Sequence, residues 1–470
     1  MALSPAEAQD QVQELYKRHT AERAELDVLR LYATSKQRLP AVIPSDASNE
    51  IKEMARTARI NVISIVIDSL TQALFVDGFR ARDEESGDDV TVPVWEAWQA
   101  NRMDKRQSGL VRATVGYGTG YMVLGQSDPE RGPDLPVMRP VSPRLLTAVY
   151  GDDDDWPRFA LEKRPRTDTW RLYDDELVWP FAYRDSRWEL TGDPSPHGLA
   201  YPPVVRFRDA EDLDLDDEAE PDNLVGLGLG RTTRVVAGQI APLMSLQDQI
   251  NLTSFSLKVA EWYSAFRKIV LIGWTPATKT EKVEASAATV WAFDEHPDEM
   301  RVDQLAQTEL SGYIQSREAA LKYAATLSQT PVHELTGQLI QMSADALAAA
   351  EAGKDRKVDE RQTGMGESWE QTFQAVGELM NVEVPNDAQV IWRDTSARSF
   401  AATVDALGKL VQMLGIPPAE LLDRVPGLTQ QDVRRIKAAM ESGDALANLT
   451  NMMDRQAQPP APEPDPAPAE

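Results

Sequence analysis

The sequence predicts an α+β fold that is mainly helical. Two long helical patterns flank a short strand-rich segment within residues 224–346, and another long helical pattern follows from Ser343. Residues 137–207 instead hold short runs rich in Trp and Tyr between turn residues, which is typical of strands. With 470 residues the chain is too long for one simple core, so we expect several structural units.

Helices dominate the N-terminal part. Apolar spacing predicts helices over residues 5–32, 48–74 and 94–113, and Ser48 is a suitable N-cap for the second of them. A glycine-rich turn and a strand follow over residues 116–124, before the strand-rich region 137–207. This order predicts that helices and short strands share one α+β region.

Two helices of matched character lie in the middle of the chain, over residues 231–266 and 308–328. Asp248 is the one charged residue between Val235 and Leu257, whereas a solvated surface helix carries charges on its outer face. We therefore expect both helices to be packed on several sides and to form a stem. The apolar stripes that we assign to this packing are Val236, Ile240, Leu243 and Ile250 on the first helix and Leu310, Ile314 and Leu321 on the second.

The remaining segments follow from breaks in the pattern. Between the stem helices, residues 268–273 and 289–293 are strand-like, in an insert of about forty residues that is too small for its own core. After the second stem helix we expect a loop over 329–342, a helix from Ser343 to about Met380, and a strand at 388–392. Helices broken near Gly415 and Pro426 fill residues 399–440.

Composition excludes several classes of protein. The absence of Cys excludes disulfides and thiolate metal sites, and favours folding in the cytoplasm. A net charge of −26 argues against a sequence-reading nucleic-acid binder, because such proteins hold phosphates with Lys and Arg. No run reaches the roughly 18 apolar residues of a membrane span, so we expect no membrane contact. The Pro- and acid-rich residues 457–470 predict a disordered tail.

Motifs for catalysis or cofactor binding are missing from the sequence. The four histidines are scattered, no P-loop pattern occurs, and Gly226–Gly230 lacks the third glycine of a dinucleotide-binding loop. We therefore predict no catalytic residue, cofactor or metal, and we expect that the chain is not an enzyme. The acid runs 152–155 and 209–220 are interpreted as solvated loops, with divalent-ion binding as the alternative.

Short signatures in a fixed order add to this interpretation. They are Asn61-Val62-Ile63-Ser64-Ile65-Val66-Ile67-Asp68, Tyr117-Gly118-Thr119-Gly120-Tyr121-Met122, Pro202-Pro203-Val204-Val205-Arg206-Phe207, Leu246-Gln247-Asp248-Gln249-Ile250-Asn251 and Ser343-Ala344-Asp345-Ala346-Leu347. Around two polar stem helices, and over residues 51–440, this order resembles the portal protein family of tailed bacteriophages. The closest resemblance is to the branch of long-tailed siphoviruses of Gram-positive hosts.

The resemblance implies a ring of roughly twelve subunits around a central channel. It also implies a division of the chain. Residues 1–230 and 343–398 would form the wing, 231–266 and 308–328 the stem, 267–307 the clip, 329–342 a tunnel loop, 399–446 the crown, and 447–470 a disordered tail. The stem stripes would then pack between subunits, and the polar stem faces would meet copies of themselves and a water-filled channel.

The same resemblance implies partners and a location. The terminase motor would drive double-stranded DNA through the channel without sequence specificity, and the ring would sit at one vertex of the virion after synthesis in the host bacterial cytoplasm. Head-completion or adaptor proteins, the major capsid protein and scaffolding protein would be further partners. His333, Gln338 and Gln341 are candidates to face DNA, unless residues 329–342 are an ordinary connector.

Residues of the clip are candidates for docking the terminase large subunit and then the head-completion proteins, because exposed Trp and Lys suit an interface anchor with steering charge. Both tryptophans could instead pack the small clip core. The candidates are Trp274, Lys279, Lys282 and Trp291.

Two other classes of function fit parts of the sequence. One is another virion scaffold or adaptor protein, and the other is an acidic metal-dependent hydrolase, which would need converging carboxylates on a rigid scaffold. Negative-stain images of the purified protein discriminate among these classes, since a holed ring is expected of a portal protein alone.

Overall fold

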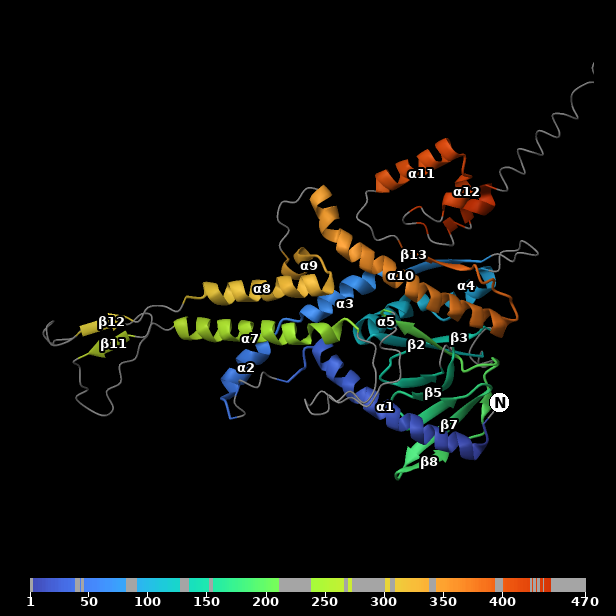
Figure 1. The fold of residues 1–470 in the computed structure, drawn as a ribbon, viewed down its shortest axis with the longest axis horizontal. Coiled ribbons are helices and arrows are strands. Elements are labelled where there is room, and N and C mark those ends of the chain that lie inside the picture. Colours follow the sequence, from blue (N-terminus) through green and yellow to red (C-terminus); the bar gives the residue numbers. More distant parts are fainter. Residues whose placement is uncertain are drawn as a thin grey trace, which may run out of the picture.

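A computed structural model shows a body of helices and sheets from which a pair of long helices projects (Figure 1). The pair is α7 (Ile240–Ala265) and α8 (Ser311–Ser328), and two short antiparallel strands lie at its far end, β11 (Ile269–Ile272) and β12 (Arg301–Gln304). The structure describes residues 3–38, 43, 46–81, 91–126, 135–151, 155–210, 238–265, 269–272, 301–304, 309–337, 344–393, 400–422, 425, 428, 432–433 and 435–440.

The N-terminal helices are α1 (Pro5–Ala33), α2 (Asn49–Thr57) and α3 (Val62–Ala73). Ser4 and Glu7 form a capping box on α1, and Ser48 caps α2 as predicted. The single helix expected over 48–74 is wrong, because Asn61 starts a second helix by accepting a hydrogen bond from the Ser64 amide at 3.1 Å. The first backbone amides of a helix have no acceptor within that helix, and an Asn side chain at the N-cap accepts a hydrogen bond from one of them. Asn61 therefore marks the start of a separate helix.

The next predicted helix is also two helices, α4 (Thr91–Ala100) and α5 (Met103–Tyr117), with strand β1 (Val76–Arg80) before them. Arg102 separates the two helices in a left-handed conformation with φ 54°. Gly118 ends α5 at φ 89°, a conformation that suits glycine because it has no Cβ. The prediction missed the first break because Arg is an ordinary helix former.

The strands that the sequence predicted in this region are present, and they form two antiparallel sheets. The first has the order β10-β2-β3, and the second has the order β4-β5-β6-β7-β8 with β9 also paired to β7. Helix α1 lies across the second sheet, where Ala8, Val12 and Leu15 pack against Trp170 and Trp188. The strands are β2 (Thr119–Gly125), β3 (Val137–Val141), β4 (Leu146–Tyr150), β5 (Pro157–Lys163), β6 (Thr169–Tyr173), β7 (Leu177–Arg184), β8 (Arg187–Leu190), β9 (Ser195–Pro196) and β10 (Val204–Arg208).

The long helix α10 (Ala344–Met380) crosses the body, and β13 (Gln389–Trp392) then pairs with β1. Both agree with the sequence prediction. Phe373 of α10 packs on Phe79 with ring centroids 4.2 Å apart, which ties the helix to the sheet. Helices α11 (Phe400–Leu414) and α12 (Pro418–Leu421) follow, separated at Gly415, where φ is 70°.

The central segments differ from the prediction in their boundaries. The first stem helix is not continuous from residue 231, because Gly238 and Gln239 lie outside a helix and the Gln239 amide donates to the Val115 carbonyl at 2.8 Å, so that α7 starts at Ile240. The second starts at Ser311 and not at 308. The expected loop 329–342 contains a short helix, α9 (Val332–Thr336). The strand expected at 289–293 lies outside the described residues, and the prediction missed β12, which pairs with β11.

Across the described part of the chain, every helix is too short or too polar to cross a bilayer.

Candidate functional site: the stem pair and its base

We call α7 and α8 the stem pair. Its inner face belongs to the main core of the same chain. Ile240, Leu243 and Ile250 are exposed by only 1%, 3% and 0%, in one cluster with the alanines of α8, and Leu321 packs against that cluster. The prediction that these residues pack between subunits is therefore wrong for the three buried ones, since their side chains are already covered. Leu310 is half-buried, and Val236 lies outside the described residues.

Large apolar side chains are exposed along the stem pair and at its base. Tyr323 and Leu327 are one turn apart on α8 and are 65% and 55% exposed. A monomer in water rarely keeps such groups together, because covering them with another molecule is favourable. The members of this stem surface are Trp262, Tyr313, Ile314, Tyr323, Leu327 and Val332. Of the predicted packing residues that the structure describes, Ile314 alone belongs to it.

Several polar residues of α7 have partners within the chain. Gln247 is buried, and its side-chain oxygen accepts hydrogen bonds from the amides of Val62 at 3.0 Å and Ile63 at 3.3 Å. Its side-chain nitrogen donates to the Ile60 carbonyl at 2.6 Å and to Asn251 Oδ1 at 3.0 Å. We had assigned the polar residues of this helix to contacts with the channel and with other subunits. Gln247 instead binds the first amides of α3 within the same chain.

The next residue of α7 reaches the first helix of the chain. Asp248 accepts a hydrogen bond of 2.6 Å from the hydroxyl of Tyr32, which lies in the last turn of α1. Burial, followed by this hydrogen bond and the carboxylate charge, raises the pKa of Tyr32 to about 12. The stem pair is therefore fastened to both α1 and α3 by side chains that lie next to each other in the sequence.

A second polar cluster lies where the stem pair meets the body. We call it the stem joint, and its members are Asp209, Gln239, Ser328, Lys357 and Arg361. Gln239 Nε2 donates to Asp209 Oδ2 at 2.5 Å. Lys357 Nζ donates to Gln239 Oε1 at 2.6 Å and to the Ser328 carbonyl at 2.8 Å. The joint thus connects the end of β10, the start of α7, the end of α8 and the middle of α10.

Backbone contacts hold two parts of the joint in place. The Asp209 amide donates to the Gly118 carbonyl at 3.0 Å, and the Gln239 amide donates to the Val115 carbonyl at 2.8 Å. Burial raises the pKa of Asp209. Burial, and secondly the charge of Arg361, lowers the pKa of Lys357 to about 8. Asp209 is the first residue of an acid run that we interpreted as solvated, and for Asp209 itself that interpretation is wrong.

The predicted channel residues lie largely outside the described part of the chain. His333 is described, on α9, where its imidazole Nε2 is 4.0 Å from Glu351 of α10. One turn away, Lys354 binds Glu334 at 2.7 Å and fastens α9 to α10. The predicted residues outside the described ranges are Gln338 and Gln341 of the loop and Trp274, Lys279, Lys282 and Trp291 of the clip.

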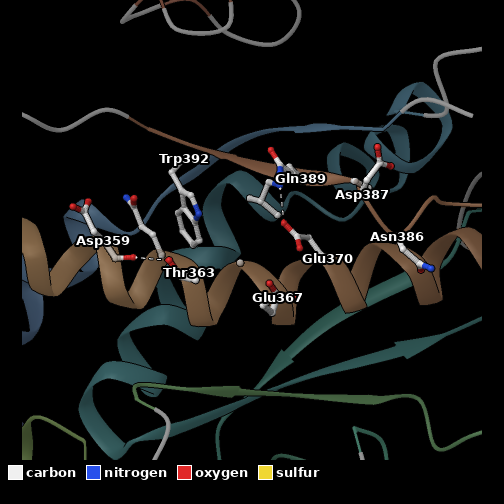
Figure 2. A pocket seen from close by; sticks show the side chains of 12 residues that line it. Asp359, Thr363, Glu367, Glu370, Asn386, Asp387, Gln389 and Trp392 are labelled. Carbon is white, nitrogen blue, oxygen red and sulfur yellow. Dashed lines mark hydrogen bonds between the residues drawn. The ribbon is translucent and has the colours of Figure 1, made fainter. Parts of the chain in front are cut away.

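A groove of about 540 Å³ lies between α10 and β13 (Figure 2). Four carboxylates line it, from Asp359, Glu367, Glu370 and Asp387, and the Trp392 ring points toward α10. Burial raises the pKa of Glu370, as does the charge of Glu367, although a hydrogen bond from the Val390 amide opposes them. Within the described ranges, this groove included, no three His, Cys, Asp or Glu residues are placed to hold a metal ion.

Comparison with known families decides what kind of protein carries this stem pair. Residues 12–444 match the family model described as phage portal protein, SPP1 Gp6-like. The chain belongs to this family. The resemblance drawn from the sequence signatures is thereby confirmed. The protein is a phage portal protein, the connector between head and tail, and its family is structural.

Individual relatives agree with the family assignment. The portal protein of Mycobacterium phage D29 is 25% identical over 424 residues, covering 84% of this chain and 82% of the relative. The portal protein of Mycobacterium phage L5 is 23% identical over 449 residues, covering 89% and 86%. Both relatives match over most of their own length.

Solved structures resemble the chain only distantly. A chain from the virion of a native gene transfer agent particle has a TM-score of 0.46 at 13% identity, covering 85% of this chain and 99% of that one. A chain from the neck of the native particle, computed with C12 symmetry, has a TM-score of 0.43 at 12% identity, covering 85% and 96%. The assignment to the portal family rests on the sequence match.

Proposed function

We propose that this portal protein assembles as a closed ring, of roughly twelve subunits, around a channel at one vertex of the capsid. The observation that carries the proposal is the stem surface, where Tyr323 and Leu327 are exposed on a pair of helices that projects from the body. In a ring, the stem surface of one subunit is covered by a different surface of the next. Such head-to-tail contacts bury apolar groups that a single chain leaves in water.

The division of the chain follows from the position of each element. We assign α7 and α8 to the stem, β11 and β12 to the clip at its far end, and α11 and α12 to the crown. The sheets, α1 to α5 and α10 form the wing. Residues 329–337, which include α9, follow α8 at the body end of the stem pair, and this position supports assigning the loop 329–342 to the channel wall.

Genome packaging and ejection are the processes that this ring serves. We propose that the terminase large subunit docks on the clip, with Lys279 and Lys282 as steering charges, and that head-completion proteins later use the same end. DNA passes without sequence-specific contacts, because a chain with net charge −26 offers little to grip phosphates. Capsid and scaffolding proteins would contact the wing, and assembly would follow synthesis in the host cytoplasm.

The ring is tested by removing the stem surface. Replacing both residues, in Tyr323→Ser/Leu327→Ser, is expected to convert rings into smaller species, since each buried side chain contributes about 1.5–3 kcal/mol at every interface. Light scattering and negative-stain images report the outcome. Val404→Ser is the matched control, because Val404 is also an exposed apolar residue, 43% exposed, but lies on α11. Wild-type protein that stays monomeric at micromolar concentration contradicts the ring itself, and intact variant rings contradict the role of this surface.

A further inference from the structure

The stem joint holds three charged side chains in the interior of the protein. Asp209, Lys357 and Arg361 are exposed by 2%, 6% and 9%. A charge that leaves water loses its hydration, and the interior compensates only when each charge has a close partner of opposite sign and well-formed hydrogen bonds. How well these three charges are paired therefore decides whether the joint is tight or is close to opening.

The pairing in the joint is incomplete. Arg361 Nε and Asp209 Oδ1 are 3.5 Å apart, and within the described residues neither buried atom has a hydrogen-bond partner. Arg361 also reaches the exposed Glu360 at 2.9 Å. Lys357 forms no ion pair with a described residue, because its two acceptors are the neutral oxygens of Gln239 and Ser328. The ammonium group is thus buried without a direct counter-ion.

This one ammonium group nevertheless connects both body-side ends of the stem pair. Gln239 directly precedes α7, and Ser328 is the last residue of α8. A cation at the C-terminal end of a helix is favourable, because the last carbonyls carry partial negative charge. After Ser328 the chain turns through Gln329, at φ 55°, into α9. Release of Lys357 would remove the contact that holds the end of α8 to α10, and α9 would then be held to α10 by the Lys354–Glu334 and His333–Glu351 contacts and by apolar packing.

We propose that the stem joint is a release point, at which the end of α8 and the turn into α9 separate from the body when the Lys357 ammonium group returns to water. The cost of burying this charge favours the open joint, whereas its two hydrogen bonds and the surrounding packing favour the closed one. The inference concerns the single chain, and it holds whether or not the ring and channel proposed above are correct.

The proposal predicts an unusual dependence on pH. The closed joint binds the Lys357 proton less tightly than water-exposed lysine does, since burial lowers the pKa of Lys357 to about 8 from the usual 10.5. The open joint binds the proton more tightly, so raising the pH through this range favours the closed joint. Opening thus becomes rarer as the solution becomes more alkaline, although alkali destabilises many other proteins.

The other titratable groups around Lys357 are Asp209 from β10 and Glu360 and Arg361 from α10. The ends of α7 and α8 present only the neutral Gln239 and Ser328. One turn away lie His333 and Glu334 of α9 with their partners Glu351 and Lys354 of α10. Lys354, as a partly exposed lysine in the same region, needs its own control.

Hydrogen exchange on the full-length protein tests the proposal. After division by the intrinsic exchange rate, protection of the amides in residues 325–337 should rise about twentyfold between pH 7.5 and 9.5, the factor that follows from pKa values of about 8 closed and 10.5 open. Amides of α3 and α5 serve as the internal reference. Protection that is constant or falls with pH over residues 325–337 overturns the proposal.

Variants assign the effect to one side chain. Lys357→Arg keeps a cation that does not lose its proton in this range, and Lys357→Met removes the charge, so both are expected to flatten the pH profile. Lys354→Met is the matched control on the same helix and should keep the rise. If Lys357→Met does not fold, Lys357→Arg still tests the proposal. If amide protection still rises with pH in Lys357→Arg, another group is responsible and the proposal is wrong.

Discussion

Replacing Gln247 by alanine should be among the most damaging single changes on the stem pair. The side chain is 2% exposed and makes four hydrogen bonds, to the amides of Val62 and Ile63, to the Ile60 carbonyl and to Asn251. In the variant the Ile63 amide is left buried without its acceptor, whereas the Val62 amide keeps a contact with the Ile60 carbonyl at 3.2 Å.

The size of the effect follows from these partners. One buried donor without an acceptor costs about 1–3 kcal/mol, and each further lost bond about 0.5–1.5 kcal/mol. These terms sum to about 2.5–7.5 kcal/mol for the four bonds, and because bonds within one network are not additive we expect the free energy of unfolding to fall by about 3–5 kcal/mol. Urea denaturation followed by circular dichroism at neutral pH measures this change.

Gln249→Ala is the matched control, because Gln249 lies two residues further along the same helix and is exposed. Its change in unfolding free energy should stay within about 0.5 kcal/mol. Equal denaturation midpoints for the two variants would show that Gln247 does not hold α3 on the stem pair, and the reasoning from buried hydrogen bonds would be refuted.

Four further predictions concern the binding of duplex DNA, the binding of the terminase, the loop at residues 329–342 and the stability of the fold at low pH. Purified protein should show no tight binding of duplex DNA near physiological salt, and a nanomolar affinity in an anisotropy titration would contradict this. Lys279→Glu/Lys282→Glu should weaken terminase binding in a pull-down but leave ring size unchanged, and unaltered binding would remove the steering role. Deleting residues 336–339 should lower the yield of packaged DNA in rings of normal size, so wild-type yield would contradict a channel role for the loop. Burial lowers the pKa of His19 from 6.5 to about 4, so the folded state binds fewer protons and loses about 2–3 kcal/mol of stability between pH 6.5 and 4.5. A His19→Gln variant with the same loss in urea denaturation would contradict that assignment.

Local sequence determined the kind and order of most elements. Ser48, Gly415 and the apolar spacing of the long helices act through hydrogen bonds and side-chain contacts within a few residues, and they can be interpreted without the tertiary structure. The helix from about Ser343 to Met380 and the strand at 388–392 were predicted for this reason. The family signatures were recognisable in the same way, because they are short and occur in order.

Element boundaries were harder to predict wherever a distant contact decides them. Just before α7, the Gln239 amide donates to the distant Val115 carbonyl, and Gly238 packs so closely on the backbone of Gly116 and Gly118 that no side chain fits there. Asn61 and Arg102 divide predicted helices, yet neither residue type forbids a helix interior. At these places the packing of one element on another outweighs local preference.

The sequence alone determined that this chain is an acidic, mainly helical α+β protein with a stem of two matched helices, and it carried the portal signatures. Tertiary structure decided what the stem residues contact: it placed Ile240 and Ile250 in the core, joined Gln247 to the start of α3, and brought Asp209 to Lys357 and Arg361. The physical reason is the distance along the sequence between the residues that interact. Spacing and caps depend on neighbours within one or two helical turns, whereas the partner of a buried polar group is set by the packing of segments far apart in the chain.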